Sequence, residues 1–292
     1  MSNRRTFIAT LMMWASAAVA RGATQDSAPV KPSVERKLSM RIKMEGFGDV
    51  DEANIKAVLR STAGEIWRHC PNTRLEPGFE IYHNSKHPIA HFERSGDGNI
   101  VIGLAVEGRL WARFAHQFAH EFAHALMDHS NDWRRLWRKA EHGNQWLEEC
   151  LCETASLFCL RAMAQTWTTK PPYPNWKSYA PSLADYVAKH LASPQRRLPD
   201  GQTFAAWFAA EEPGLRKNGS QRDKNTVIAQ QLLPLFEATP SGWEALSALK
   251  LGKRDIKKPL AEHLEEWRAN APAPQRAFII RCAAIFGVPL RA

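Results

Sequence analysis

The sequence predicts an α+β fold, in which a small sheet precedes a largely helical second half of the chain. Residues 38–106 contain short segments with the alternation typical of strands, interrupted by one segment with helical spacing. After residue 110 the spacing of apolar residues is mostly helical, with breaks at Pro, Gly and Ser. With 292 residues, 44% of them hydrophobic, the chain can bury one large core or two modest ones.

The first domain is expected to span residues 38–165. Strands are expected at residues 38–44, 79–82, 89–92 and 99–106, and helices at residues 51–69, 110–129 and 145–164. The helix at 110–129 should pack beneath the sheet. If the strand at 99–106 forms the sheet edge beside this helix, it can bind an extended peptide by strand addition.

The second domain, residues 166–292, is expected to be a smaller helical unit that closes one side of the first. Three prolines within residues 171–174 end the preceding helix. Further helices are expected at residues 182–192, 202–211, 221–236, 242–249, 260–269 and 274–286.

The N-terminal residues 1–23 are predicted to be a signal peptide, and residues 24–37 a linker. Arg4 and Arg5 precede an apolar run that ends in a small-x-small pattern at residues 18–20. The run is too short for a convincing transmembrane helix. The order Arg-Arg-x-Phe-Ile resembles the twin-arginine export signal, although an ordinary secretory signal stays open. We therefore expect a periplasmic or secreted protein that does not span the membrane after cleavage.

The segment at residues 110–129 contains His120-Glu121-x-x-His124. On a helix, residues four apart share one face, so the two imidazoles can bind one metal ion. Glu121 flanks that site and can take a proton from metal-bound water. His116, one turn earlier on the same face, is interpreted as a neighbour rather than a further ligand. Asp128 either orients His124 or faces solvent.

A third ligand is expected from the helix at residues 145–164. This helix is apolar on most faces and therefore buried, so its carboxylates need partners. Glu148 is expected to turn outward near the start of the helix, whereas Glu149 and Glu153 lie four apart on one face. Two histidines and one carboxylate are the ligand set of a catalytic zinc site, with one position left for water.

The combination of H-E-x-x-H with Trp146-Leu147-x-Glu149 resembles the gluzincins, a group of zinc metallopeptidases. In their aminopeptidase branch the second motif is Trp-Leu-Asn-Glu-Gly; here Glu148 replaces Asn and Cys150 replaces Gly. The resemblance covers about residues 112–158 and implies a zincin-like fold, with a small twisted sheet over the H-E-x-x-H helix.

The resemblance also implies the roles of the site residues. Zn²⁺ is bound by His120, His124 and Glu149, Glu121 is the general base, and Glu153 orients a ligand histidine. A Tyr or His usually assists the oxyanion, and the sequence does not choose among Tyr173, Tyr179, Tyr186 and His190. The Gly-x-Met-Glu-Asn segment of the aminopeptidases is missing, which favours an endopeptidase or an enzyme of narrow specificity.

The expected function is therefore that of an exported zinc metallopeptidase acting on a peptide or protein. The alternative is a non-catalytic zincin-fold protein that binds acidic envelope polymers. The net charge is +9, and removal of residues 1–20, which contain Arg4 and Arg5, leaves +7, which favours acidic partners. The basic, Trp-containing cluster at residues 133–139 is interpreted as a solvated helix face, so nucleic acid is not expected as a partner.

Five cysteines have no spacing typical of a disulfide scaffold or a structural zinc site. Cys150 and Cys152 lie two apart on a predicted helix, so they point in different directions. We expect mostly buried thiols, with one disulfide involving Cys70 or Cys282 left open.

Overall fold

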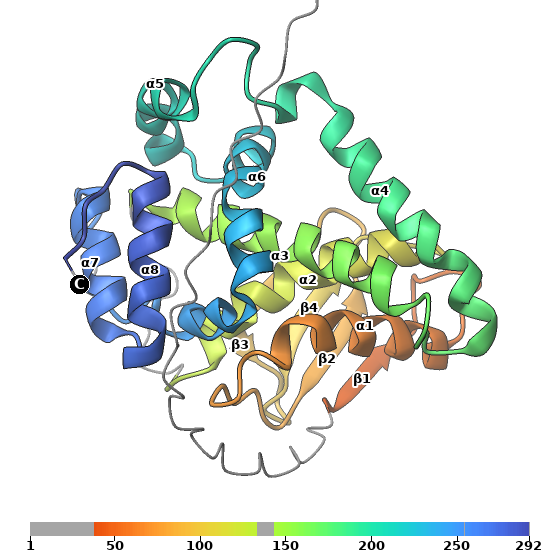
Figure 1. The fold of residues 1–292 in the computed structure, drawn as a ribbon. Coiled ribbons are helices and arrows are strands. Elements are labelled where there is room, and N and C mark those ends of the chain that lie inside the picture. Colours follow the sequence, from red (N-terminus) through yellow and green to blue (C-terminus); the bar gives the residue numbers. More distant parts are fainter. Residues whose placement is uncertain (1–37, 133–142, 254, 292) are drawn as a thin grey trace, which may run out of the picture. The chain divides into compact units, whose positions relative to one another are not determined.

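A four-stranded mixed sheet forms one side of the molecule. The computed structural model describes residues 38–132, 143–253 and 255–291, so the predicted signal peptide, linker and basic cluster lie outside the described residues. The strands are β1 (Met40–Lys43), β2 (Phe79–His83), β3 (Ile89–Arg94) and β4 (Ile100–Leu104) (Figure 1). The predicted α+β class is confirmed.

The order of the strands is β1-β2-β4-β3. β1, β2 and β4 are parallel, and β3 is antiparallel to β4. The expectation that residues 99–106 form the sheet edge is therefore wrong. β4 pairs with β2 on one side and with β3 on the other, so its backbone groups are used on both sides. The edge strand on this side of the sheet is β3.

Three long helices form the core with the sheet. They are α1 (Glu52–Trp67), α2 (Trp111–His129) and α3 (Gln145–Thr166), at the positions predicted. α2 contacts β3 and β4 on one side and α3 on the other. Phe118 and Phe122 of its apolar stripe pack against Phe79 of β2, with ring centroids 6.1 and 5.7 Å apart. This packing fixes the rotation of α2 and directs His116, His120 and His124 toward α3, whereas His129 contacts the His91 carbonyl of β3.

The remaining chain is helical, as predicted. Its elements are η1 (Pro174–Tyr179), α4 (Ala180–Ala192), η2 (Pro194–Arg196), α5 (Phe204–Lys217), α6 (Arg222–Ala238), η3 (Pro240–Ala248), α7 (Leu260–Asn270) and α8 (Ala273–Ile285). The helix expected at 242–249 is the 3₁₀ helix η3. Residues 38–292 cluster as one compact unit, with no division at the boundary expected after residue 165. The reason is α3, which contacts α1 and α2 on one side and α4 and α6 on the other.

All five cysteines are buried, and none of them forms a disulfide. The expectation of buried thiols is confirmed, and no disulfide forms at Cys70 or Cys282. Within the described residues, no helix has the length and apolar character needed to cross a membrane.

Candidate metal and catalytic site

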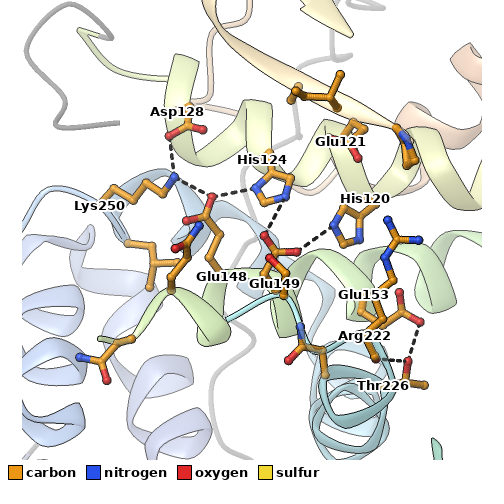
Figure 2. A pocket seen from close by; sticks show the side chains of 18 of the residues that line it. His120, Glu121, His124, Asp128, Glu148, Glu149, Glu153, Arg222, Thr226 and Lys250 are labelled. Atoms are coloured by element: carbon orange, nitrogen blue, oxygen red, sulfur yellow. Dashed lines mark hydrogen bonds and ion pairs between the residues drawn. The ribbon is translucent and has the colours of Figure 1, made fainter. Parts of the chain in front are cut away.

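The facing surfaces of α2 and α3 bring His120, His124 and Glu149 together (Figure 2). Glu149 Oε2 lies 3.3 Å from His120 Nε2, and Glu149 Oε1 lies 3.7 Å from His124 Nε2. Both separations exceed the usual hydrogen-bond range. Ligand atoms of a tetrahedral zinc ion, bound at about 2.0–2.1 Å, are separated by about 3.3–3.4 Å. Two imidazoles and one carboxylate suit a zinc ion by their chemistry. The His120–Glu149 separation matches the zinc spacing, whereas the His124–Glu149 contact uses the other carboxylate oxygen and is longer.

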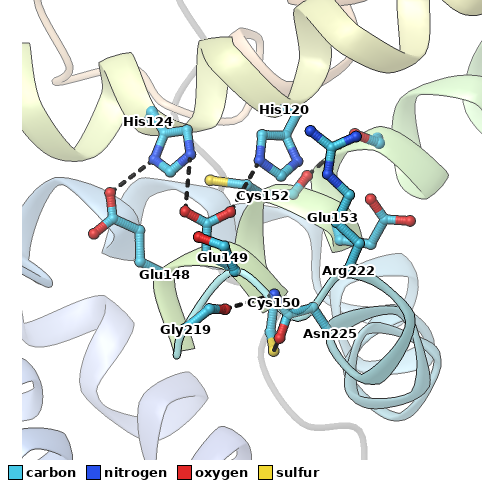
Figure 3. Close-up of polar contacts among 12 residues, drawn as sticks. His120, His124, Glu148, Glu149, Cys150, Cys152, Glu153, Gly219, Arg222 and Asn225 are labelled. Carbon is cyan, nitrogen blue, oxygen red and sulfur yellow. Dashed lines mark hydrogen bonds and ion pairs between the residues drawn. The ribbon is translucent and has the colours of Figure 1, made fainter. Parts of the chain in front are cut away.

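Cys152 is a second candidate for the third ligand. Its sulfur and ring nitrogens of His120 and His124 lie within 4.8 Å of one another (Figure 3). Burial raises the pKa of the Cys152 thiol to about 12. Burial also raises the pKa of Glu149, but its contacts with His120 and His124 outweigh that effect and lower it. Glu149 lines the cavity at this site and Cys152 does not, so Glu149 is the better candidate for a site that must also hold substrate.

Glu148 fixes the orientation of His124. The imidazole Nδ1 donates to Glu148 Oε1 at 2.7 Å, which leaves Nε2 free to bind a metal ion. Glu148 is buried, so the expectation that it turns outward is wrong. The sequence reasoning missed its partner, Lys250, whose Nζ lies 2.6 Å from Glu148 Oε1. Together with His124, this ammonium group offsets the burial of the carboxylate and lowers its pKa.

Lys250 also binds Asp128, with Nζ donating to Asp128 Oδ1 at 2.8 Å. Asp128 is buried and does not contact His124 through any hydrogen bond that the structure records. It acts on that histidine through the charge that the two residues share at close range and through Lys250 and Glu148. His124, Asp128 and Glu148 have the composition of a metal site. The lysine ammonium lies between both carboxylates, however, so this group is better described as a buried ion-pair network.

Glu121 is the most isolated charged group of the site. Its side chain is buried, with 3% relative exposure, and it lines the cavity beside His120. It forms no hydrogen bond or ion pair with any residue that the structure describes. Its oxygens are not among the fully buried polar atoms, so a ligand or a water molecule in the cavity can reach the carboxylate.

Glu153 lies one turn beyond Glu149 and does not contact His120 or His124. The expectation that it orients a ligand histidine is therefore wrong. His190 Nε2 of α4 donates to Glu153 Oε1 at 2.6 Å, and Thr226 Oγ1 of α6 donates to the same oxygen at 3.1 Å. Glu153 Oε2 faces His116 Nε2 at 3.7 Å. Apart from the predicted ligand Glu149, the α3 carboxylate that contacts a ligand histidine is Glu148, because Glu153 lies too far along α3.

Two of the four candidate oxyanion donors line the cavity, namely Tyr186 and His190. The Tyr179 hydroxyl accepts a hydrogen bond from the Ala112 backbone amide at 3.2 Å, outside the cavity lining. Tyr173 packs edge-on against Trp176. The structure thus narrows the candidates to Tyr186 and His190.

A cavity of about 660 Å³ opens over these residues. Its lining includes Ile89, Ala90 and Phe92 from the edge strand β3. Arg113 and Arg222 also line it and form no ion pair with any described residue. Arg222 extends from α6 toward the space beside His120 and Glu153 (Figures 2 and 3). The cavity therefore combines a candidate metal site, an edge strand and free cations.

Comparisons of the chain with protein-family models, with curated proteins and with solved structures found no match.

The contribution of Glu153 to stability is expected to depend on pH. Burial raises the pKa of Glu153, but His116 and His190 outweigh burial and hold it well below the ordinary value of 4.5. When the pKa of a carboxylate is lower in the folded state than in the unfolded state, the group stabilises the protein at pH values above its unfolded-state pKa. That stabilisation is lost as the pH falls through the folded-state pKa. Urea unfolding of metal-free protein should therefore show wild type more stable than Glu153→Gln at pH 7, with the difference shrinking below pH 4.5. A difference that is constant down to pH 2 would contradict this assignment.

Proposed function

We propose that this chain is an exported zinc-dependent metallopeptidase of gluzincin type. The observation that carries the proposal is Glu121, a buried carboxylate without a partner that faces a cavity beside two histidines four residues apart. A carboxylate held in that state is suited to accept a proton from a water molecule. The resemblance of the two sequence motifs to gluzincins and the sheet-over-helix arrangement of β3, β4 and α2 support the same proposal.

The proposed metal ligands are His120, His124 and Glu149, with Glu148 orienting His124. A zinc ion held by these residues would supply Lewis-acid chemistry that acidifies water and polarises the scissile carbonyl. Glu121 takes the proton from the attacking water and then delivers it to the leaving amine. Tyr186 donates to the carbonyl oxygen as negative charge develops on it, since the Nε2–H of His190 is already used by Glu153.

The edge strand β3 supports a peptide as the substrate. Ile89, Ala90 and Phe92 line the cavity, so an extended peptide paired with this edge lies next to the metal ligands. The unpaired guanidinium groups of Arg113 and Arg222 favour acidic side chains in that peptide. This preference agrees with the basic net charge of the chain.

The proposal is tested by measuring zinc content and the hydrolysis of a mixed peptide library by the purified chain. We expect cleavage that is lost on chelation and restored by zinc. Glu149→Ala should lose activity together with the zinc ion of this site, whereas Cys152→Ser should keep both. Zinc loss in Cys152→Ser alone would assign the third ligand to the thiol. A chain that binds zinc but cleaves no peptide would support the alternative, a non-catalytic envelope-binding protein.

A further inference from the structure

A second cluster of metal-ligating side chains lies one helical turn from the proposed zinc site. It consists of His116 on α2, Glu153 on α3 and His190 on α4, and one ligand atom of each lies within 4.8 Å of the others. All three residues line the same cavity as His120 and Glu149. The cluster repeats the composition of the proposed zinc site, two histidines and one glutamate, with different residues.

The state of His116 is unusual for a purely structural histidine. Its Nε2 atom is buried and has no hydrogen-bond partner among the described residues. The nearest carboxylate oxygen, Glu153 Oε2, lies 3.7 Å away, which equals the separation of Glu149 Oε1 from His124 Nε2.

We propose that His116, Glu153 and His190 form a second site for a divalent transition-metal ion, separate from the proposed zinc site. Imidazole and carboxylate ligands suit zinc and its neighbours in the first transition row. The open side of the cluster faces the cavity, so substrate or water can complete the coordination. A metal ion at this position also supplies the partner that His116 Nε2 lacks.

Metal binding requires a change of tautomer at His190. Its Nε2–H now donates to Glu153 Oε1, and its Nδ1 accepts a hydrogen bond from Arg196 Nη1 at 2.8 Å. When Nε2 binds the ion, its proton moves to Nδ1, and the Arg196 donor must withdraw. Arg196 keeps a second partner, because its Nε donates to Asp223 Oδ1 at 2.8 Å. Arg196 therefore competes with the metal ion without being needed for the site.

The test is the zinc stoichiometry and affinity of the full chain, measured by calorimetric titration of metal-free protein with zinc alone. We expect wild type to bind about two zinc ions per chain, and His116→Gln and His190→Gln to bind about one zinc ion per chain each. Glu149→Ala should also retain about one ion, at the second site. The control His87→Gln, which changes an exposed histidine of the cavity lining, should bind as wild type.

Arg196→Met provides a measurement that does not depend on losing a ligand. Removal of the competing donor should increase the zinc affinity of the second site by about tenfold, because the hydrogen bond from the Arg196 guanidinium no longer opposes the tautomer change of His190. If the cluster had only a structural role, Arg196→Met would not increase the affinity of the chain for zinc. The proposal is overturned if wild type binds a single ion that Glu149→Ala abolishes while His116→Gln, His190→Gln and Arg196→Met bind as wild type. Failure of the proposed zinc site would instead leave zinc binding unchanged in Glu149→Ala.

Discussion

Replacement of Glu121 by Gln is expected to lower kcat for peptide hydrolysis by about 10²–10⁴-fold while zinc stays bound. The amide has the size of the carboxylate but cannot accept the proton of water. Glu121 is not among the proposed metal ligands, so the zinc content measured after dialysis should stay that of wild type. The matched control is Glu107→Gln, which changes an exposed carboxylate that does not line the cavity.

The same substitution should leave the metal-free protein as stable as wild type or make it more stable. In wild type, Glu121 is a buried carboxylate without a partner among the described residues, and burial of an unpaired charge is unfavourable. Thermal unfolding in the presence of a chelator measures this effect. A clear loss of stability in Glu121→Gln would mean that the carboxylate is structural, and retained activity would remove it from the proposed mechanism.

Replacement of Lys250 by Met is expected to destabilise the protein by about 3–5 kcal/mol, measured by urea unfolding at neutral pH. The Lys250 side chain is only 13% exposed and lies between Asp128 and Glu148, which are 5% and 6% exposed. Its removal leaves two buried carboxylates facing each other without the cation. The second expected effect is a loss of zinc affinity by about 10–100-fold, because Glu148 no longer holds His124 in place.

Two further variants make this result specific. Lys253→Met changes an exposed lysine of the same cavity lining and should have little effect on stability. Asp128→Asn added to Lys250→Met should recover part of the lost stability, since it removes one of the uncompensated charges. If Lys250→Met unfolds with the free energy of wild type, the ion-pair network does not stabilise the fold.

The part of the site that lies on one helix could be predicted from the sequence, because helical spacing is a local property. His120 and His124 share a face by their separation alone, and the phenylalanine stripe on α2 sets which face is turned to the sheet. The helix boundaries followed from the same local signals. Glu149 could be predicted as a ligand only from the resemblance, since nothing local separates it from its neighbours.

The parts that could not be predicted depend on contacts between distant segments. The order of the strands places β3 at the edge, and this depends on the pairing of β4 with β2. The roles of Glu148 and Glu153 depend on what faces α3 from the second half of the chain. Lys250 lies 122 residues after Asp128, and an isolated lysine near the end of a 3₁₀ helix carries no signal of its partner.

The position of Lys250 in the chain has a consequence for synthesis. A nascent chain that ends shortly after α3 already contains both histidines and Glu149 but lacks the cation that offsets the burial of Glu148. Glu148 and His124 therefore reach their final ion-pair network only when the segment after η3 has docked on α2. Zinc binding at the proposed site should accordingly be tightest only once the segment that carries Lys250 is in place.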